Sequence, residues 1–330
     1  MFVAVLGARL RGTWGRLPRS PGTRQHVTVT PTGEQYEIAH GDQRAVVVQV
    51  GGALRSYDVA GRRVVDGFAA GARPDGGRGQ LLAPWPNRIR DGRYRWGDTD
   101  QQLALSEAVS HNAIHGLVRW SEWSLLRGSD SSVTVGIRLW PQPGYPFRID
   151  LSATYRLAHD GLSVTIIGRN VGTEAAPYGV GQHPYVTAGT DHIDDAVLTV
   201  PADQWLRCDD RGLPVATEPV AGTPYDFRAP RAISQTALDT PYAALSRDAD
   251  GRVVVRLDSP DGAHGVGVWL GEGAEFLQLF SGDKLAPPRR RTGLAVEPMS
   301  CPPDAFNSGV GLVALQPGAR HTLRWGIFTR

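Results

Sequence analysis

Glu297 stands in the segment LAVEPMSCPPDAF (294–306), directly after an apolar run and directly before Pro298. A carboxylate in such a run is unusual, because removing its water is costly unless another group compensates. The same loss of water raises the proton affinity of a carboxylate and makes it a better base near neutral pH. Glu297 is therefore a candidate functional residue. The alternative is an acid at a strand end, paired with one of the arginines at 289–291.

His183 lies in the glycine-rich segment PYGVGQHPYVTAG (177–189), between Tyr178 and Tyr185. Glycine lets a backbone approach a ligand closely, and the two tyrosines supply apolar faces. Pro184 favours an extended backbone at His183 and so restricts the directions in which its ring can point. We predict a histidine that works at a ligand site. The alternative is a loop histidine without a role.

Arg88 and His115 lie in two further polar segments, LLAPWPNRIRDGRY (81–94) and HNAIHGL (111–117). Prolines stiffen the loop before Arg88, so its guanidinium can offer several fixed donors to an oxygen-rich ligand or to an acid. His111 and His115 are four residues apart, which would suit zinc in a helix, but the β-rich context disfavours a helix here. We expect a hydrogen-bonding histidine at the wall of a site, for which His115 is the candidate. For His111 the alternative is a satisfied core histidine.

Asp239 and Gln278 give weaker signals, in TALDTPYAAL (236–245) and FLQLFSGD (276–283). An aspartate before Thr-Pro is usually a turn residue or a cap. Gln278 stands between two leucines of a strand, so it faces either water or a polar site. Neither residue would identify a site by itself.

Strands must position these residues, because β-rich runs fill the chain from about residue 28. Examples are RAVVVQV (44–50), SVTVGIRLW (132–140), RIDLSATYRL (148–157), LSVTIIG (162–168), RVVVRLD (252–258), GVGVWL and FLQLFS (276–281). Several runs alternate polar and apolar residues, and turn-forming clusters such as AHDG and SPDG separate them. The pattern predicts an all-β fold, a large antiparallel β-sandwich or barrel with few short helices. We expect one domain over residues 26–330 and a disordered N-terminal extension over residues 1–25.

The composition excludes several classes of function. The formal net charge of +2 in 330 residues, with scattered arginines, gives no nucleic-acid footprint. Cys208 and Cys301 form no disulfide framework and no metal-binding spacing, which fits a reducing cytoplasm. No run approaches the roughly 18 apolar residues of a membrane helix. We therefore expect a cytoplasmic protein with no membrane or nucleic-acid partner.

The polar segments, taken in order, resemble the motifs of the aldose 1-epimerase (galactose mutarotase-like) family. The segments that carry this resemblance are PWPNRI, IHGL, GQHPY, LQLFSG and LAVEPMSCPPDAF, spread over residues 84–306. The resemblance implies a β-sandwich of very large sheets, the supersandwich of that family, and a sugar as the small-molecule ligand. It implies His183 as the catalytic acid and Glu297 as the catalytic base. The residues that it implies as contacts to the sugar are Arg88, His115, Asp239 and Gln278. It implies no cofactor and no metal, and we expect a monomer or weak homodimer.

The chemistry implied is mutarotation, the interconversion of α and β anomers of a cyclic aldose through the open-chain aldehyde. Ring opening removes a proton from the anomeric hydroxyl and adds one to the ring oxygen, so an acid and a base on opposite sides of the anomeric centre can do both. Glucose or galactose is the expected substrate.

Three alternatives remain open from the sequence. A phosphorylated or sulfonated sugar would need a cation, for which Arg73, Arg78, Arg90 or the arginines at 289–291 are candidates, unless these are solvated loop charges. A non-catalytic sugar-binding protein would use tryptophans, of which the candidates are Trp85, Trp96, Trp120 and Trp123. A glycoside hydrolase would usually have two carboxylates at the bond rather than a histidine and a glutamate.

Overall fold

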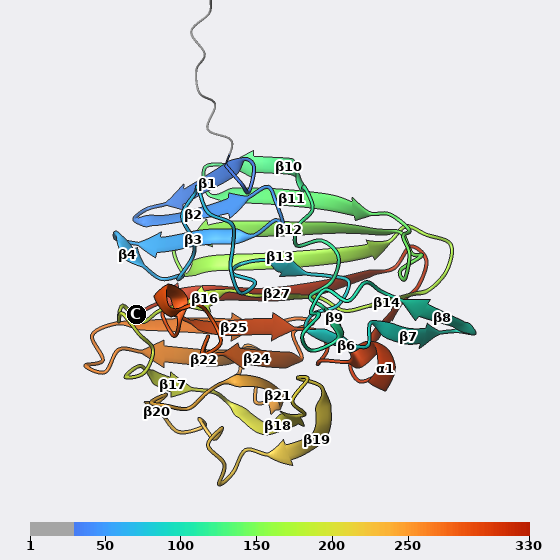
Figure 1. Cartoon of the computed structure of the whole chain (residues 1–330). Helices are drawn as coiled ribbons and strands as arrows, with labels where there is room; N and C mark the ends of the chain where they lie inside the picture. Colours follow the sequence, from blue (N-terminus) through green and yellow to red (C-terminus); the bar gives the residue numbers. More distant parts are fainter. Residues whose placement is uncertain (1–29) are drawn as a thin grey trace, which may run out of the picture.

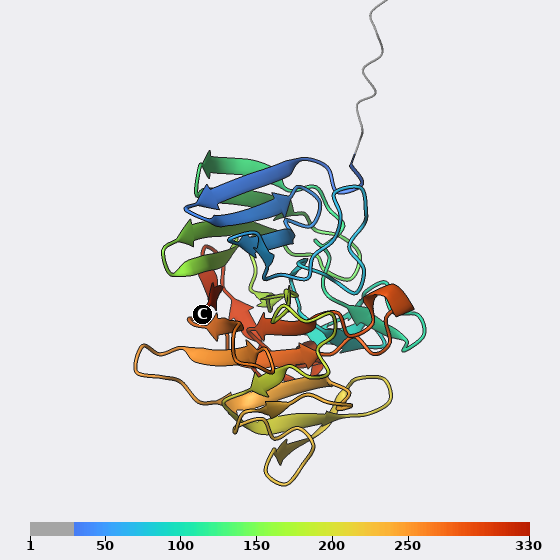
Figure 2. The same cartoon turned by 90° about the vertical axis from the view of Figure 1, so that its left-hand side faces the viewer.

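Two large antiparallel sheets organise residues 30–330, the part of the chain that the computed structural model describes. In Figure 1 the nine-stranded sheet runs from β10 at its upper edge through β13 and β27 to β17 and β20 at its lower edge. The C-terminal strand β27 pairs with β13 on one side and β23 on the other, so the last strand of the chain lies inside this sheet. Figure 2 shows a four-stranded sheet lying against β11 and β12.

The strands have the following bounds. The nine-stranded sheet contains, in spatial order, β10 (Ser124–Ser129), β11 (Ser132–Leu139), β12 (Ile149–Ala158), β13 (Gly161–Asn170), β27 (Arg320–Thr329), β23 (Gly265–Leu270), β22 (Val253–Asp258), β17 (Val197–Thr199) and β20 (Arg231–Ala232). The eight-stranded sheet contains β19 (Pro214–Pro219), β18 (Ala202–Cys208), β21 (Asp239–Leu245), β24 (Phe276–Phe280), β25 (Leu294–Met299), β15 (Gly181–Gln182) and β5 (Leu81–Leu82), with β16 (Tyr185–Val186) also on β25. The four-stranded sheet contains β1 (Gln35–His40), β2 (Gln43–Val48), β3 (Leu54–Val59) and β4 (Arg62–Arg63).

Smaller pairs and two short helices complete the described residues. The pairs are β6 (Arg88–Arg90) with β9 (Asn112–Ile114), β7 (Arg93–Trp96) with β8 (Thr99–Gln102), and β14 (Ala176–Tyr178) with β26 (Val313–Leu315). The helices are η1 (Pro287–Arg289) and α1 (Ala305–Ser308). The predicted all-β fold with few short helices is confirmed. The N-terminal extension predicted for residues 1–25 lies outside the described residues.

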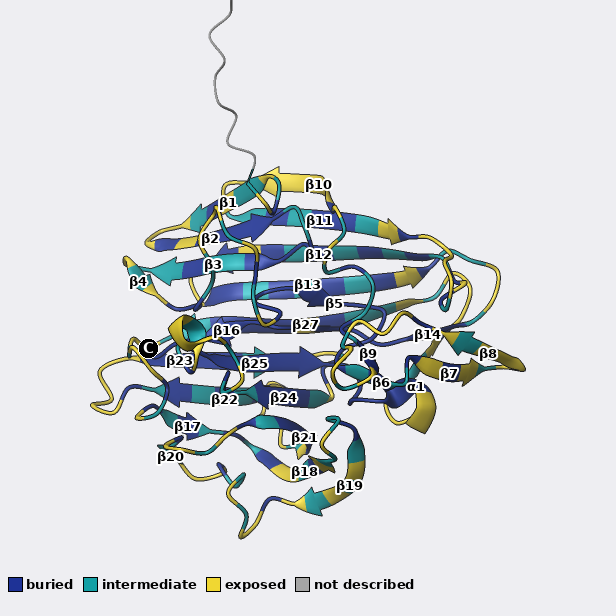
Figure 3. Cartoon of the chain, in the orientation of Figure 1, coloured by how far each residue is buried: buried dark blue, intermediate teal, exposed yellow. Residues whose placement is uncertain are grey.

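The long central strands follow the alternation in their sequences. Along β12 and β13, buried and less buried residues alternate, and the buried Ala153 and Tyr155 stand opposite the buried Ile166 and Val164. Directly opposed residues in an antiparallel pair share a face, so this register places the apolar side of both strands on the core. Figure 3 shows the consequence: the inner strands are mostly buried, whereas the edge strand β10 is exposed along its length.

β25 departs from this alternation, because all six of its residues are buried. Glu297 lies inside the strand, between Val296 and Pro298, and is 1% exposed. The alternative of an acid at a strand end therefore does not hold, because Glu297 lies within the strand and its side chain is buried.

Among residues 30–330, none of the helices has the length and apolar character needed to cross a membrane.

Candidate active site

A cavity of about 960 Å³ opens over the eight-stranded sheet, and all six predicted site residues line it. They come from segments far apart in the chain: Arg88 begins β6, His115 follows β9, His183 lies between β15 and β16, Asp239 begins β21, Gln278 is on β24 and Glu297 is on β25. Arg88 and Asp239 thus occupy strand ends, where the sequence indicated a loop and a turn. The volume is at the upper end of the range of about 300–1,000 Å³ for small-molecule pockets.

Strand register explains why three of these side chains meet. Gln278 on β24 stands directly opposite Glu297 on β25 and opposite Pro241 on β21. Opposed residues share a face, and so do residues two apart along a strand, so Asp239 points to the same side as Gln278 and Glu297. The contact agrees with this: Gln278 Nε2 donates to Asp239 Oδ1 at 2.9 Å. The leucines on either side of Gln278 are fully buried on the core face.

Backbone bonds and ring packing fix His183. Its N–H donates to the carbonyl of Gln80, and its carbonyl accepts from Gly79. Its ring stacks on Tyr185, with centroids 5.1 Å apart and an interplanar angle of 6°. Gly77 has φ +77°, and a Cβ there would lie 2.6 Å from His183 Cδ2, so glycine at this position leaves the ring its space. Of the two tyrosines noted in the sequence, Tyr185 packs on His183.

His183 and Glu297 are in direct contact. Nε2 of the histidine lies 3.3 Å from Oε1 of the glutamate, and both side chains are buried. His183 Nδ1 and Glu297 Oε2 are also buried, and within residues 30–330 neither has a hydrogen-bond partner. Buried polar atoms are normally hydrogen-bonded, so such a pair of atoms marks a strained or a functional position. The sequence interpretation put acid and base on opposite sides of a sugar carbon, whereas in this structure the two groups are adjacent.

Burial pushes the two pKa values in opposite directions. Desolvation raises the pKa of Glu297 well above its usual value, and the charge of Asp239 raises it further, while Arg88 opposes the shift. Desolvation lowers the pKa of His183 to about 3, with a smaller contribution from the positive charge of Arg78. At pH values between the low pKa of His183 and the raised pKa of Glu297, the two side chains therefore share one titratable proton. In the uncharged arrangement this proton is on Glu297.

His115 has a defined tautomer. The N–H of Asn87 donates to His115 Nδ1 at 3.2 Å, so this nitrogen carries no proton. Burial lowers the pKa of His115 well below its usual value, and the neighbouring His183 lowers it further. A neutral imidazole with an accepting Nδ1 carries its proton on Nε2. His115 therefore offers a hydrogen-bond donor beside His183, whose ring centroid is 5.4 Å from its own.

A salt bridge to Glu107 orients Arg88. Nε and Nη2 of Arg88 each donate to one oxygen of Glu107 at 2.8 Å, a bidentate pair. Nη1 donates to Asn87 at 3.3 Å. A Cβ on Gly212, where φ is +74°, would lie 2.6 Å from Nη1, so this glycine permits the approach. The guanidinium is thus held at the cavity wall by an acid that the sequence did not single out.

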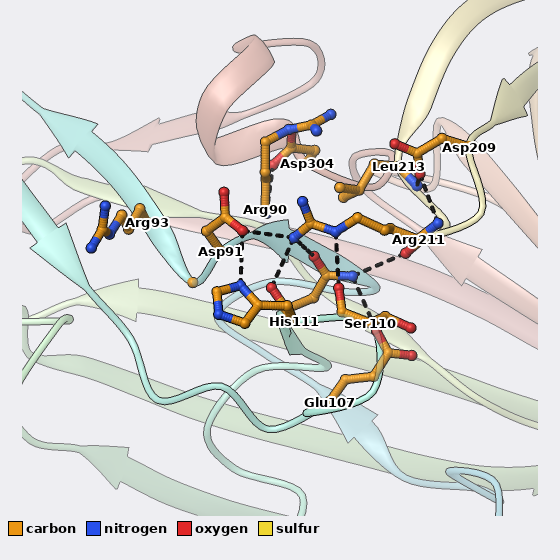
Figure 4. A network of polar contacts seen from close by, with 12 residues as sticks. Arg90, Asp91, Arg93, Glu107, Ser110, His111, Asp209, Arg211, Leu213 and Asp304 are labelled. Atoms are coloured by element: carbon orange, nitrogen blue, oxygen red, sulfur yellow. Dashed lines mark hydrogen bonds and ion pairs between the residues drawn. The ribbon is translucent and has the colours of Figure 1, made fainter.

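Behind Glu107 lies a network, drawn in Figure 4, that joins two loops of the cavity rim. Asn112 Nδ2 donates to Glu107 Oε2 at 3.2 Å and to the carbonyl of Arg211 at 2.9 Å. Arg211 Nη2 donates to Asp91 Oδ1 at 2.7 Å and to the carbonyl of His111 at 2.9 Å. His111 Nδ1 lies 2.9 Å from the same Asp91 oxygen. We call Asp91, Glu107, His111, Asn112 and Arg211 the Arg211 network.

The structure disfavours two alternatives that the sequence left open. His111 is not a core histidine, because its side chain is 63% exposed and lies beside Asp91. Most of the arginines considered for an anion are already paired with acids. Arg78 lies 2.8 Å from Asp66, and Arg289 and Arg90 also have acid partners. Arg291 pairs with Asp194 and Asp283 at 2.9 Å each. None of these arginines lines the cavity, and none of those at 289–291 pairs with Glu297 among the described residues.

The cysteines and tryptophans divide between core and cavity. Cys301 is buried and Cys208 is partly buried at the cavity wall, where desolvation raises the pKa of its thiol to about 12. Of the tryptophans considered for sugar stacking, Trp85 and Trp123 are core residues, whereas Trp120 lines the cavity and is 52% exposed. Within residues 30–330, no group of three or more His, Cys, Asp or Glu side chains is arranged to hold a metal ion.

Sequence reasoning missed several lining residues, among them Glu107, Arg119, Trp205 and Lys284. Glu107 stands in the ordinary polar stretch ALSEAVS and carries no signal. Arg119 follows the IHGL motif closely, and Lys284, the only lysine of the chain, follows LQLFSGD directly. Proximity to a motif was the one signal available for these two residues.

A family model described as aldose 1-epimerase matches residues 34–327. The chain belongs to the aldose 1-epimerase family. Its relatives include the Escherichia coli K12 protein YihR, 37% identical over 298 residues that make up 90% of this chain and 94% of the relative. The E. coli protein YphB is 24% identical over 301 residues, 87% of this chain and 96% of the relative.

Solved structures of the family share the fold at low identity. A Caenorhabditis elegans GalM/aldose epimerase homologue has a TM-score of 0.80 at 18% identity, covering 90% of this chain and 98% of the other. The galactose 1-epimerase of Lactobacillus acidophilus NCFM has a TM-score of 0.74 at 20% identity, covering 88% of this chain and 92% of the other. The galactose mutarotase-like fold implied by the sequence motifs is thereby confirmed. The family indicates an enzyme of the epimerase type.

Proposed function

We propose that this protein is a mutarotase that interconverts the α and β anomers of a free aldohexose such as galactose or glucose. The observation that carries the proposal is the His183–Glu297 contact of 3.3 Å at the wall of the cavity, with a buried atom on each side chain that has no hydrogen-bond partner among residues 30–330. Membership of the aldose 1-epimerase family supports it. So does the fold shared with a galactose 1-epimerase.

The short distance between His183 and Glu297 suits a substrate whose two reacting oxygens are bonded to the same carbon. In a cyclic aldose, the anomeric hydroxyl and the ring oxygen are both bonded to C1, so an acid and a base that work on them must also be close together. Glu297 takes the proton of the anomeric hydroxyl, a C1=O bond forms and the C1–ring oxygen bond breaks. His183 gives its proton to the ring oxygen. After rotation about C1–C2, the same two groups act in reverse to close the other anomer.

One proton shared by the pair is enough for this cycle. In the empty site, burial favours the uncharged arrangement, with the proton on Glu297. Sugar hydroxyls that donate to the carboxylate stabilise its charge, and the proton then moves across the contact to His183, which makes Glu297 the base and His183 the acid. Because the base returns its proton to the substrate at ring closure, the pair has the same protonation state after each turnover.

Four other residues hold the sugar in this scheme. Arg88 and the Nε2 proton of His115 supply donors to sugar oxygens. Asp239 and Gln278 supply acceptors from the neighbouring strands, and Gln278 Oε1 is a buried atom without a partner among the described residues. Unsatisfied acceptors and donors aimed at one cavity are what a polyhydroxylated ligand requires.

Exchange NMR of the α and β anomers of galactose and glucose tests the proposal. Purified protein should accelerate exchange well beyond the spontaneous rate, and the Glu297→Gln variant should not. A folded protein that binds the sugars, for example by saturation-transfer NMR, without accelerating exchange would favour the alternative of a non-catalytic sugar-binding protein.

A further inference from the structure

Arg78 is a fully buried charge that the proposed mechanism does not use. Its side chain is 1% exposed, and it is not among the residues that line the cavity. Nη1 donates to the carboxylate of the equally buried Asp66 at 2.8 Å and to the carbonyl of that residue at 2.9 Å, and Nε donates to Asp75 at 3.0 Å. Desolvation offsets much of the attraction in a buried ion pair, so such a pair is weak evidence for a role in stability alone. Arg78 is therefore a candidate for another role.

The guanidinium of Arg78 lies over a tyrosine that is stacked on the proposed catalytic acid. Arg78 Cζ is 4.0 Å from the ring centroid of Tyr185. The rings of Tyr185 and His183 are nearly parallel, at 6°, with centroids 5.1 Å apart. The hydroxyl of Tyr185 donates to the carbonyl of Gly76 at 2.8 Å, which fixes the ring between its two neighbours. Tyr185 thus joins a buried cation to the histidine of the catalytic pair.

The backbone on both sides of Arg78 also contacts this histidine. Gly77, directly before Arg78, lies so close to the His183 ring that a Cβ there would be 2.6 Å from Cδ2. Gly79, directly after Arg78, donates its N–H to the carbonyl of His183 at 2.8 Å. The ion pairs of Arg78 therefore fix the loop that forms one wall of the His183 position.

The charges around His183 act on its acidity. Besides Arg78, the titratable and charged side chains that face it among the described residues are Glu297 on β25, His115 after β9, Arg119 and Tyr185 on β16. Desolvation is the main reason for the low pKa of His183, about 3, and Arg78 contributes more than Arg119 to lowering it further. A tyrosine ring attracts a cation, but a ring that already contacts a guanidinium gains little from a second cation beside the first. The resting site therefore disfavours an imidazolium at His183.

We propose that Arg78 is a positioning residue for the catalytic acid: it holds the His183 ring in place through Tyr185 and the loop at residues 76–79, and it disfavours a charged His183 until substrate is bound. This inference rests on the proposed mutarotase function and adds a residue that acts on the reaction without touching the sugar. The ring oxygen of an aldose is a weak base, so its protonation needs a strong acid, and an imidazolium near a fixed guanidinium is one. The sequence suggested Arg78 for an anionic sugar, and the structure assigns it to the acid instead.

Exchange NMR of the galactose anomers, over a range of pH and sugar concentration, tests the proposal on the double variant Asp66→Asn/Arg78→Met. This variant removes both members of the buried pair, so neither charge is left alone in the core. Because Arg78 does not line the cavity, kcat should fall about 10- to 100-fold while KM stays within about threefold. Because a positive charge is lost, the pKa of His183 should rise, and the acid limb of kcat/KM should move to higher pH by about one unit.

Ring ¹⁵N NMR follows the protonation of His183 without turnover. Its signals, assigned as those that are lost in His183→Gln, should titrate at higher pH in the double variant than in the wild type. Arg78→Lys is the conservative comparison, because it keeps the charge but not the planar group over Tyr185. Its acid limb should stay near that of the wild type, and its kcat should lie between those of the wild type and the double variant.

Asp194→Asn/Arg291→Met is the matched control. Arg291 is also a buried arginine with a carboxylate at 2.9 Å, and it is not among the charges that act on His183. This control should leave the acid limb and the His183 titration unchanged, whatever its effect on the melting temperature. If the Arg78 double variant titrated like the wild type, or if its KM rose as much as its kcat fell, the positioning role would be overturned.

Two further outcomes separate this inference from the function on which it rests. No acceleration of exchange by the wild-type protein would refute the mutarotase, and the His183 titration would still show whether Arg78 acts on this ring. Thermal unfolding checks that the double variant folds. If it does not fold, Arg78→Lys decides: a lower kcat at unchanged KM supports the positioning role, and wild-type kinetics overturn it.

Discussion

Two polar clusters meet at the same cavity, and they differ in how completely their atoms are paired. In the Arg211 network, none of the side chains has a buried atom without a hydrogen-bond partner among residues 30–330. In the catalytic cluster of His183, Gln278 and Glu297, each side chain has one such atom. A saturated network rigidifies a structure, whereas an unsaturated one leaves its capacity for a ligand. The difference separates the residues that hold the cavity from the residues that we propose to work in it.

Removing the proposed base should have the largest effect. Glu297→Gln keeps the shape of the side chain but cannot take a proton, so kcat should fall about 10²–10⁴-fold. The melting temperature should not fall, because a buried carboxyl is replaced by a neutral amide. Exchange NMR and thermal unfolding measure the two effects. Glu122→Gln, at an exposed acid that contacts Gln49, is the control. Activity within tenfold of wild type would assign the base elsewhere.

Weakening the salt bridge between Arg88 and Glu107 should have the second-largest effect. Glu107→Gln removes the charge from a bidentate pair whose side chains are 13% and 21% exposed. We expect a loss of about 1–3 kcal/mol in the free energy of unfolding. Because Arg88 is then less well positioned, we also expect KM to rise more than kcat falls. Urea unfolding measures the free energy of unfolding, and exchange rates over a series of sugar concentrations give KM and kcat. A change in kcat alone would show that Glu107 acts in the chemistry rather than in positioning.

The pH profile tests the shared proton. The one-proton pair is lost on the acid side near the pKa of His183, about 3, and on the alkaline side at the raised pKa of Glu297. Asp239 raises the pKa of Glu297, so Asp239→Asn should move the alkaline limb of kcat/KM to lower pH. Arg88 lowers that pKa, so Arg88→Gln should move the same limb to higher pH. If the alkaline limb moved in the same direction in both variants, or moved in neither, it could not be assigned to Glu297.

Breaking the ion pair between Asp91 and Arg211, in the exposed part of the Arg211 network, should have the smallest effect on stability and activity. Asp91 is 39% exposed and Arg211 33% exposed, and solvent-exposed ion pairs typically contribute under about 1 kcal/mol. Asp91→Asn should therefore lower the free energy of unfolding by less than that amount and change kcat/KM by less than tenfold. A loss as large as that of Glu107→Gln would mean that the loop contacts themselves hold the cavity in shape.

The family motifs in the sequence already indicated the fold and the six candidate residues. The alternation of polar and apolar residues in β12 and β13 reflects one buried face of the sheet, so these strands could be predicted from the sequence. Polar residues in apolar runs, such as Gln278 and Glu297, could be found in the same way, because burial of a polar group is an anomaly in any sheet.

The tertiary structure decided which charged side chains pair with one another. No local pattern says that Glu107 holds Arg88, or that Arg289 and Arg291 pair with acids far from Glu297. These facts depend on strand register and on loops that approach from distant parts of the chain. The sequence by itself determined which residues can carry charge and which runs form strands. Only the fold decided which charges neutralise one another, because electrostatic pairing depends on distance in space rather than along the chain.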